Sequence, residues 1–307
     1  MSAASRQAAP GGDGGIGAQA RLGSVIARYA VRESLRRRVL PVVGALTAAF
    51  LVFYALGAHF AFRELGELET TSPSGFVDID DRALAGATLT GLAMFATLFL
   101  GAVLATFLTL GVVRGDSETG LLQPLLARPV ARGTILVARA IAAAAIAAAY
   151  VLAVFAVSVA ITHLTGDYTP DQLLTAGLQL AAAVVVITCI SVLVSVFTSS
   201  TAQGITVLML FGAGLTAGLL GQIGDALESA TLIDISEWMS WMLPFEALYQ
   251  DALYALTAET SGVTGFLLSL GPFGGARDTG IVLDLFALLY CAGLLGLATA
   301  AFMRRDL

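Results

Sequence analysis

Residues 172–224 read QLLTAGLQLAAAVVVITCISVLVSVFTSSTAQGITVLMLFGAGLTAGLLGQIG and contain no acidic or basic side chain. A helix that crosses the hydrocarbon core of a bilayer needs about 20 mainly apolar residues, so this stretch is too long for one span. The polar run TSSTAQG at 198–204 interrupts it. We therefore expect two transmembrane helices, at 172–197 and 204–224, joined by a short turn.

The rest of the chain contains four more apolar stretches of similar character. The composition is 57% hydrophobic and only 12% charged, whereas soluble domains carry about 25% charged residues. Only helices and closed barrels satisfy the backbone in lipid, and these runs lack the alternating pattern of barrel strands. The sequence predicts an all-α integral membrane protein of six transmembrane helices, with the remaining four spans at 39–62, 85–113, 135–163 and 282–303.

The distribution of charge predicts the orientation of these spans. Short loops with excess Arg remain cytoplasmic, and six Arg lie between residues 21 and 38, before the first span. Arg304 and Arg305 follow the last span, and the connection between spans two and three is also basic. The segments 63–82 and 225–278 are acidic. Both termini are therefore expected in the cytoplasm, which requires an even number of spans.

The N-terminal region divides into two parts. Residues 1–20 are rich in Gly, Ala, Ser and Gln and are expected to be disordered. In the following residues Arg28, Arg32 and Arg36 recur every four positions beside an apolar stripe. This spacing predicts an amphipathic helix on the inner membrane surface; the alternative is a positively charged flank that only sets topology. Residues 21–307 are expected to form a single transmembrane domain.

The predicted extracytoplasmic segment 225–280 is too long for a simple turn. Trp238, Trp241, Phe245 and Tyr249 follow helical spacing in it, and Trp and Tyr favour the membrane–water boundary. Pro244 is expected to divide this helix or to start its second half. We predict one or two short interfacial helices on the outer face, with a possible dip into the outer leaflet. Residues 257–280 could equally form an ordinary soluble cap.

Several chemistries are disfavoured by the residues that the chain lacks. All 16 basic residues are Arg, and a P-loop NTPase needs a Lys to reach the β- and γ-phosphates. No charged residue lies in the middle of a span, which disfavours an ion-coupled transporter. We therefore expect no cofactor on this chain and no nucleic-acid partner. A membrane-embedded enzyme or enzyme anchor remains an alternative, with its catalytic group among Asp225, Glu228, Asp234 and Glu237.

The most distinctive motif joins spans two and three within the predicted cytoplasmic segment 114–134. It reads RGDSETGLLQPLLARPVAR at 114–132. An acidic start is followed by an apolar run that could fill a groove in a soluble partner. The candidate contact residues are Asp116, Glu118, Gly120, Leu121, Leu122, Leu125, Leu126, Arg128, Pro129 and Arg132.

This motif resembles the cytoplasmic loop of type-2 ATP-binding-cassette permeases, the membrane subunits of many bacterial and archaeal exporters. Those proteins carry an acidic pair, a Gly, a Leu-rich run and Pro-Val-x-Arg at this place, and the C-terminal FMRRDL at 302–307 is similar to their usual end. Here Gln123 and Pro124 depart from the family's Gly-Thr-Leu-Glu pattern. The resemblance implies a six-helix exporter subunit that pairs with a second permease chain, identical or homologous, in the plasma membrane. It also implies two separate ATPase subunits, which hold the ATP and push on this loop and on the N-terminal helix.

Overall fold

The structure is a computed structural model that describes residues 39–71, 81–110, 132–258 and 279–304. These residues form helices and no strand. Six helices are long and apolar enough to cross a membrane, which confirms the predicted all-helical architecture of six spans. They are α2 (Val39–Thr71), α3 (Asp81–Thr109), α5 (Arg132–Gly166), α6 (Leu173–Phe197), α7 (Ser200–Ala226) and α11 (Gly280–Met303).

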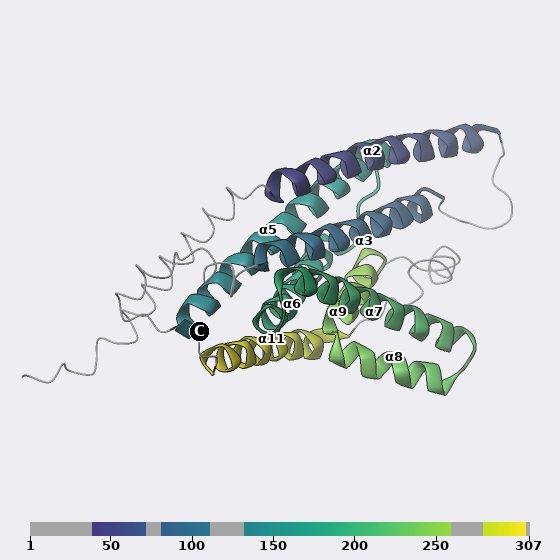
Figure 1. Ribbon diagram of the computed structural model, residues 1–307. Coiled ribbons are helices and arrows are strands. Elements are labelled where there is room, and N and C mark those ends of the chain that lie inside the picture. The colour runs from purple at the N-terminus through teal and green to yellow at the C-terminus, as the bar shows by residue number, and fades with distance from the viewer. Residues whose placement is uncertain (1–38, 72–80, 111–131, 259–278, 305–307) are drawn as a thin grey trace, which may run out of the picture.

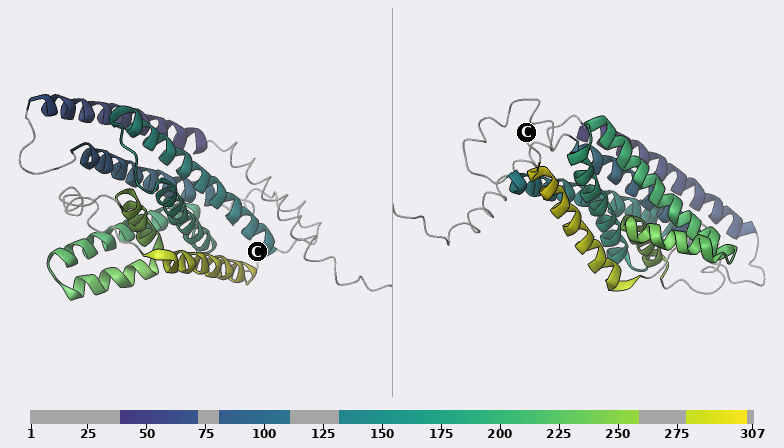
Figure 2. Two further views of the ribbon diagram at one scale, coloured as in Figure 1. Left: turned by 180° about the vertical axis from the view of Figure 1, so that it is seen from behind. Right: turned by 60° about the horizontal axis from the view of Figure 1, so that its bottom comes forward.

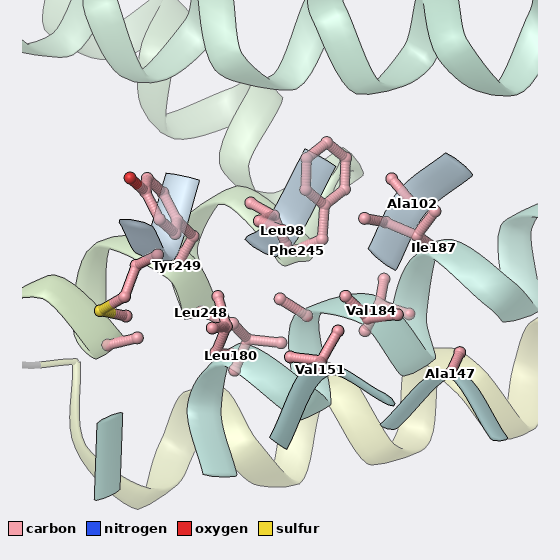
Figure 3. Close-up of a cluster of buried hydrophobic side chains, with 14 of the residues drawn as sticks. Leu98, Ala102, Ala147, Val151, Leu180, Val184, Ile187, Phe245, Leu248 and Tyr249 are labelled. Carbon is pink, nitrogen blue, oxygen red and sulfur yellow. The ribbon is translucent and has the colours of Figure 1, made fainter. Parts of the chain in front are cut away.

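Helix α6 lies at the centre of the bundle. It is apolar on all sides, as expected for a helix surrounded by others, and packs against α3, α5, α9 (Pro244–Leu256) and α11. Figure 3 shows Leu180, Val184 and Ile187 of α6 among side chains from α3, α5 and α9. The helices α2 and α8 (Ala230–Met242) lie at opposite margins of the bundle (Figures 1 and 2).

Small residues permit the close approach of the central helices. A Cβ atom on Gly101 of α3 would lie 2.6 Å from Val151 Cγ2 of α5 and 2.9 Å from Val184 Cγ2 of α6. Only a glycine therefore fits at this three-helix contact. In lipid the hydrophobic effect does little to drive helices together, so close van der Waals packing of this kind stabilises their association.

The break in the uncharged stretch falls at two residues of the polar run. Thr198 is extended, with φ −118° and ψ 164°, and caps α6 by donating its backbone N–H to the Val194 carbonyl. Helix α7 begins two residues later, at Ser200. The stretch thus forms two antiparallel helices with a very short connection.

The first helix extends beyond the apolar run from which its span was predicted. Helix α2 continues past Phe62 to Thr71. Arg63 and Glu67 form an ion pair of 3.2 Å one turn apart on this extension. Pairs at this spacing support a helix in water, so the charged residues prolong α2 beyond the predicted span.

Two short helices, α8 and α9, lie between the fifth and sixth spans, as predicted. Helix α8 runs back along α7, because Gly224 of α7 lies against Ile233 and Gly221 lies against Ser236. Pro244 is the first residue of α9, where its missing N–H costs no helical hydrogen bond.

Helix α9 enters the bundle, whereas α8 lies along its surface. The Tyr290 hydroxyl donates to the Met242 carbonyl at the apex of the hairpin, at 2.7 Å. Tyr290 lies ten residues after the start of α11, about 15 Å along that helix. Its hydroxyl satisfies a backbone carbonyl at the break between α8 and α9.

Helix α9 differs from the predicted interfacial helix in its surroundings. Phe245 and Tyr249 are buried in the bundle, and the Phe245 ring stacks on Phe211 of α7 with centroids 5.6 Å apart. Trp238 and Trp241 of α8 are exposed on the surface of the bundle. The aromatic stretch therefore divides at Pro244 into a surface half and a core half.

Hydrogen bonds fix the end of α9 to neighbouring elements. The backbone N–H of Gln172 donates to the Ala255 carbonyl at 3.1 Å, and the Tyr168 hydroxyl donates to the Leu256 carbonyl at 3.3 Å. Burial and, secondarily, the charge of Asp171 raise the pKa of Tyr168. Its hydroxyl therefore stays protonated and remains a donor.

Candidate functional site

The predicted site residues fall partly outside the described structure. The interfacial residues Arg28, Arg32 and Arg36 lie outside it, as do the coupling-segment residues between 111 and 131. Arg132 is the first residue of α5. The structure thus defines the frame to which the coupling segment is attached.

Both attachment points of that segment lie at one end of the bundle, which we call the coupling end. Helix α3 ends there at Thr109, and α5 begins there at Arg132.

Gly133 of α5 approaches α11 closely at this end, because a Cβ atom at this position would lie 2.6 Å from Thr299 Cγ2. A separate apolar cluster at this end joins α5, α6 and α11 through Leu136, Ala140, Val192, Val196 and Ala298. The last described residues of α11 lie beside the start of α5 (Figure 1).

A buried polar network connects three helices at the coupling end. The hydroxyls of Thr109, the last residue of α3, and Ser191 of α6 share a hydrogen bond of 2.6 Å. Gln203 of α7 donates from Nε2 to Thr109 Oγ1 at 3.1 Å and to Ser191 Oγ at 3.2 Å. All three side chains are almost completely buried.

This network gives α3 a specific connection to the α6–α7 turn. Polar side chains that bond across helices in lipid typically contribute about 0.6 kcal/mol and at most about 1.7 kcal/mol. These hydrogen bonds form only when donor and acceptor atoms are in register, whereas apolar side chains can pack in more than one register. The network therefore joins the end of α3 to α6 and α7 by hydrogen bonds.

A cavity of about 400 Å³ lies at the opposite end, between α7, α8, α9 and the start of α11. Glu246 of α9 lines it and is only 3% exposed. Gln250 donates from Nε2 to Glu246 Oε1 at 2.8 Å, and the Ser240 hydroxyl lies 3.4 Å from Glu246 Oε2. Trp241 and Glu237 of α8 complete the polar and aromatic part of the wall.

The glycines of α7 make room for this buried carboxylate. A Cβ atom on Gly218 would overlap Glu246 Oε1, and one on Gly221 would lie 2.6 Å from Ser236 Oγ. Gly214 similarly accommodates the Phe245 ring. These three glycines form a packing face within the chain, directed at the α8–α9 hairpin.

A groove of about 530 Å³ runs between α6 and α11. Gln179 Nε2 donates to Asp284 Oδ1 at 2.9 Å across it. Cys291 also lines this groove, and Cys189 is buried nearby on α6.

The candidate acidic residues of the predicted outer segment are exposed on α7, α8 and their connection: Asp225, Glu228, Asp234 and Glu237. Within the described ranges, no group of three or more His, Cys, Asp or Glu side chains could hold a metal ion.

Comparison with families of known proteins connects this helical frame to transport. The model of the ABC-2 family transporter proteins matches residues 24–307, nearly the whole chain. The chain belongs to the ABC-2 transporter family. It is a multi-pass membrane protein and the permease subunit of an ABC transporter. No curated protein matches the sequence of this permease.

The sequence of the ABC-2 permease does not indicate the role of two buried polar residues, Gln203 and Glu246. Gln203 was included only in a polar turn, because a single Gln gives no sign of partners in distant helices. The sequence likewise gives no sign that Glu246 is buried, because its burial depends on the packing of α9 against α7. The closely spaced glycines of α7 are the sequence signal that could have indicated a close approach beside Glu246.

Proposed function

We propose that this permease belongs to an ATP-driven exporter and receives its energy from a separate ATPase through the segment 114–132. ATP would bind to that partner, of which two copies serve a pair of permease chains, identical or homologous. The complex would reside in the plasma membrane of a bacterium or archaeon, with both permease termini in the cytoplasm. The N-terminal segment with Arg28, Arg32 and Arg36 would supply a second contact on the same side.

The observation that carries the proposal is the arrangement of the coupling end. Helix α3, which precedes the segment, ends at Thr109, and the segment ends where α5 begins at Arg132, so one push would act on two spans at once. The network of Thr109, Ser191 and Gln203 then connects the first of these spans to α6 and α7. Force applied at the segment would therefore reach four of the six spans.

Acidic and apolar residues in the segment suit different parts of this contact. Leu121, Leu122, Leu125 and Leu126 would occupy an apolar groove on the ATPase. Asp116 and Glu118 would orient the segment by charge, because complementary charges mainly improve encounter and register.

Co-purification tests the proposal. An affinity-tagged chain is extracted from its native membranes in mild detergent, and associated proteins are identified by mass spectrometry. An ABC ATPase is expected to copurify with the wild type, and Glu118→Arg is expected to reduce its recovery at least tenfold. The matched control is Glu64→Arg, which makes the same change at an exposed residue of α2 at the other end of the bundle.

The control should retain the ATPase at the wild-type level. Recovery of Glu118→Arg with a full complement of ATPase would remove the segment from the interface. Absence of any ATPase from the wild-type preparation, together with intact transport, would refute energy supply by a separate subunit.

A further inference from the structure

The groove between α6 and α11 has the polarity and the position of a lipid-binding site. The two helices pack side by side, and their last turns share the apolar cluster of the coupling end. Both therefore begin at the opposite end of the bundle. The groove has a volume of about 530 Å³, within the range of small-molecule pockets, about 300–1,000 Å³. We propose that it binds one phospholipid with a primary-amine headgroup, taken from the surrounding bilayer.

The residues that line the groove are ordered by polarity along the two helices. Thr175, Gln179 and Asp284 line it near the helix starts, whereas Val186 and Cys291 line its deeper part. The 11 positions from Thr175 to Val186 correspond to a rise of about 16 Å along α6. One leaflet contributes about half of a hydrocarbon core of about 30 Å. The groove therefore extends through about one leaflet, with its polar part near the membrane surface.

The first argument concerns charge. Asp284 is exposed and is the one charged residue among the described residues that line the groove. It lies four residues after the start of α11, about 6 Å along that helix. A carboxylate at the edge of the hydrocarbon core is unfavourable unless a cation or hydrogen-bond donors accompany it. Lipid headgroups present phosphate and ammonium at this level, and only the ammonium attracts a carboxylate.

The second argument concerns hydrogen bonding. Gln179 is only 8% exposed, and its Nε2 donates to Asp284 Oδ1 at 2.9 Å. This is the one side-chain hydrogen bond that either residue makes in the described part of the chain. Asp284 Oδ2 and Gln179 Oε1 thus remain acceptors. An ammonium group has three donors and no acceptor, so it can donate to both, whereas the trimethylammonium of phosphatidylcholine has no N–H to donate.

The third argument concerns the apolar part of the ligand. Leu178, Ala182, Ala287 and Leu288 also line the groove. Leu178 is 61% and Leu288 67% exposed, so the groove is open to the outside of the bundle. On a chain that spans a membrane, acyl chains lie against such a surface. The expected ligand is therefore an aminophospholipid, whose ammonium meets Asp284 and whose acyl chain follows the groove.

This inference goes beyond the proposed energy supply and does not rest on it. Lipid binding can be measured on the purified permease without any ATPase. A failure of lipid binding is thus distinguishable from a failure of ATPase association.

Native mass spectrometry with defined lipids tests the proposal. The purified full-length chain is titrated with phosphatidylethanolamine, phosphatidylcholine and phosphatidylglycerol that carry identical acyl chains. Phosphatidylethanolamine should bind with a Kd at least tenfold lower than that of either other lipid. Its N-methyl and N,N-dimethyl derivatives should have intermediate values, because they keep the charge and lose donors one at a time. Equal affinities for phosphatidylethanolamine and phosphatidylcholine would overturn the proposal without the use of any variant.

Variants then assign the binding to the groove. Asp284→Asn keeps the size of the side chain and an oxygen that can accept from Gln179, but it removes the charge. It should weaken phosphatidylethanolamine binding at least tenfold and leave phosphatidylcholine binding unchanged, which also checks that the variant is folded. The matched control Asp234→Asn alters an exposed carboxylate of α8 outside the groove and should bind as the wild type does. An unchanged preference in Asp284→Asn would overturn the assignment to this groove.

Two further measurements separate a lipid from other occupants. Glycerophosphoethanolamine, which has the headgroup but no acyl chain, should not displace the bound lipid at a hundredfold excess. Displacement would show a site for soluble amines and would overturn the proposal. The spectra also resolve monomers from dimers, and each chain of a dimer should retain the lipid. Loss of the lipid from dimers alone would show that a second copy covers the groove, and would likewise overturn the proposal.

Discussion

At the scale of single residues, the glycines of α7 have two different environments. Gly214, Gly218 and Gly221 lie against the α8–α9 hairpin, where an added Cβ would collide with Phe245, Glu246 or Ser236. Gly204 and Gly212 have no atom within 4 Å of an added Cβ. The first group is required by packing inside the chain, and the second is not.

Gly214→Ala is expected to destabilise the protein, because the new methyl group would overlap the buried Phe245 ring. Overpacking of this kind typically costs about 1–3 kcal/mol. The free energy of unfolding is measured in mixed detergent–SDS micelles by circular dichroism. Gly212→Ala on the same helix is the control and should show no loss. Equal stability of the two variants would contradict the packing of the hairpin against α7.

Thr109 and Thr97 allow the polar network to be tested on one helix. Both are fully buried on α3, but Thr97 bonds only to the carbonyl of Ala93, one turn before it in the same helix. Thr109→Val removes one acceptor from Gln203 Nε2 and should cost about 1 kcal/mol more than Thr97→Val in the same unfolding assay. A smaller loss for Thr109→Val than for Thr97→Val would show that the network does not stabilise the coupling end.

At the scale of elements, the α8–α9 hairpin shows how similar sequences acquire different surroundings. Both helices have 13 residues and combine aromatic, aliphatic and acidic side chains. No residue of α8 is buried, whereas ten residues of α9 are buried. Pro244 separates the two helices, and the reversal of direction at that point places α9 between α6 and α7.

Cysteine accessibility tests this placement. In a background without Cys189 and Cys291, Ala252→Cys on α9 should resist a membrane-impermeant maleimide, because Ala252 is completely buried. Thr231→Cys, at the exposed start of α8, should be labelled rapidly. Labelling is read by the mass shift on gels. Rapid labelling of Ala252→Cys would indicate a surface helix and would refute the burial of α9 within the bundle.

A second contact of the hairpin fixes the start of α11. The backbone N–H and the hydroxyl of Thr279 both donate to Asp251 Oδ1, at 3.1 and 3.2 Å. Asp251 therefore connects α9 to the N-terminus of the last span, where a negative charge is also favoured by the helix dipole.

At the scale of the whole molecule, the bundle has two distinct ends. One contains the attachment points of the coupling segment and the polar network. The other contains the mouth of the α8–α9 hairpin and the carboxylate cavity. The six spans connect them, so an ATPase at the first end would act on the second end only through the helices.

The Arg distribution predicts that the coupling end faces the cytoplasm. A fluorescent protein fused after Leu307 should therefore fluoresce, and alkaline phosphatase inserted after Glu228, in the exposed α7–α8 connection, should be active outside the cytoplasm. Fusions of each reporter at the other site should be inactive. An active phosphatase at the C-terminus would invert the topology and contradict the cytoplasmic position of the segment 114–132.

The number of spans and their helical nature follow from the hydropathy of the chain. Hydrophobicity is a local property, and a bilayer requires about 20 apolar residues per span wherever they occur in the chain. The break at Thr198 and Ser199 was likewise predictable, because polar residues interrupt an uncharged stretch that is too long for one helix. The coupling motif was recognisable for the same reason, as a contiguous run of residues.

Which polar residues meet depends on how the helices pack in three dimensions. Thr109, Ser191 and Gln203 belong to three helices, and Glu246 becomes buried only because the hairpin reverses at Pro244 and the glycines of α7 leave room for it. Burial of a charged side chain depends on the approach of distant segments, which local periodicity does not encode. The spans were therefore determined by the sequence, whereas the buried network and the carboxylate cavity were determined by the packing of the spans.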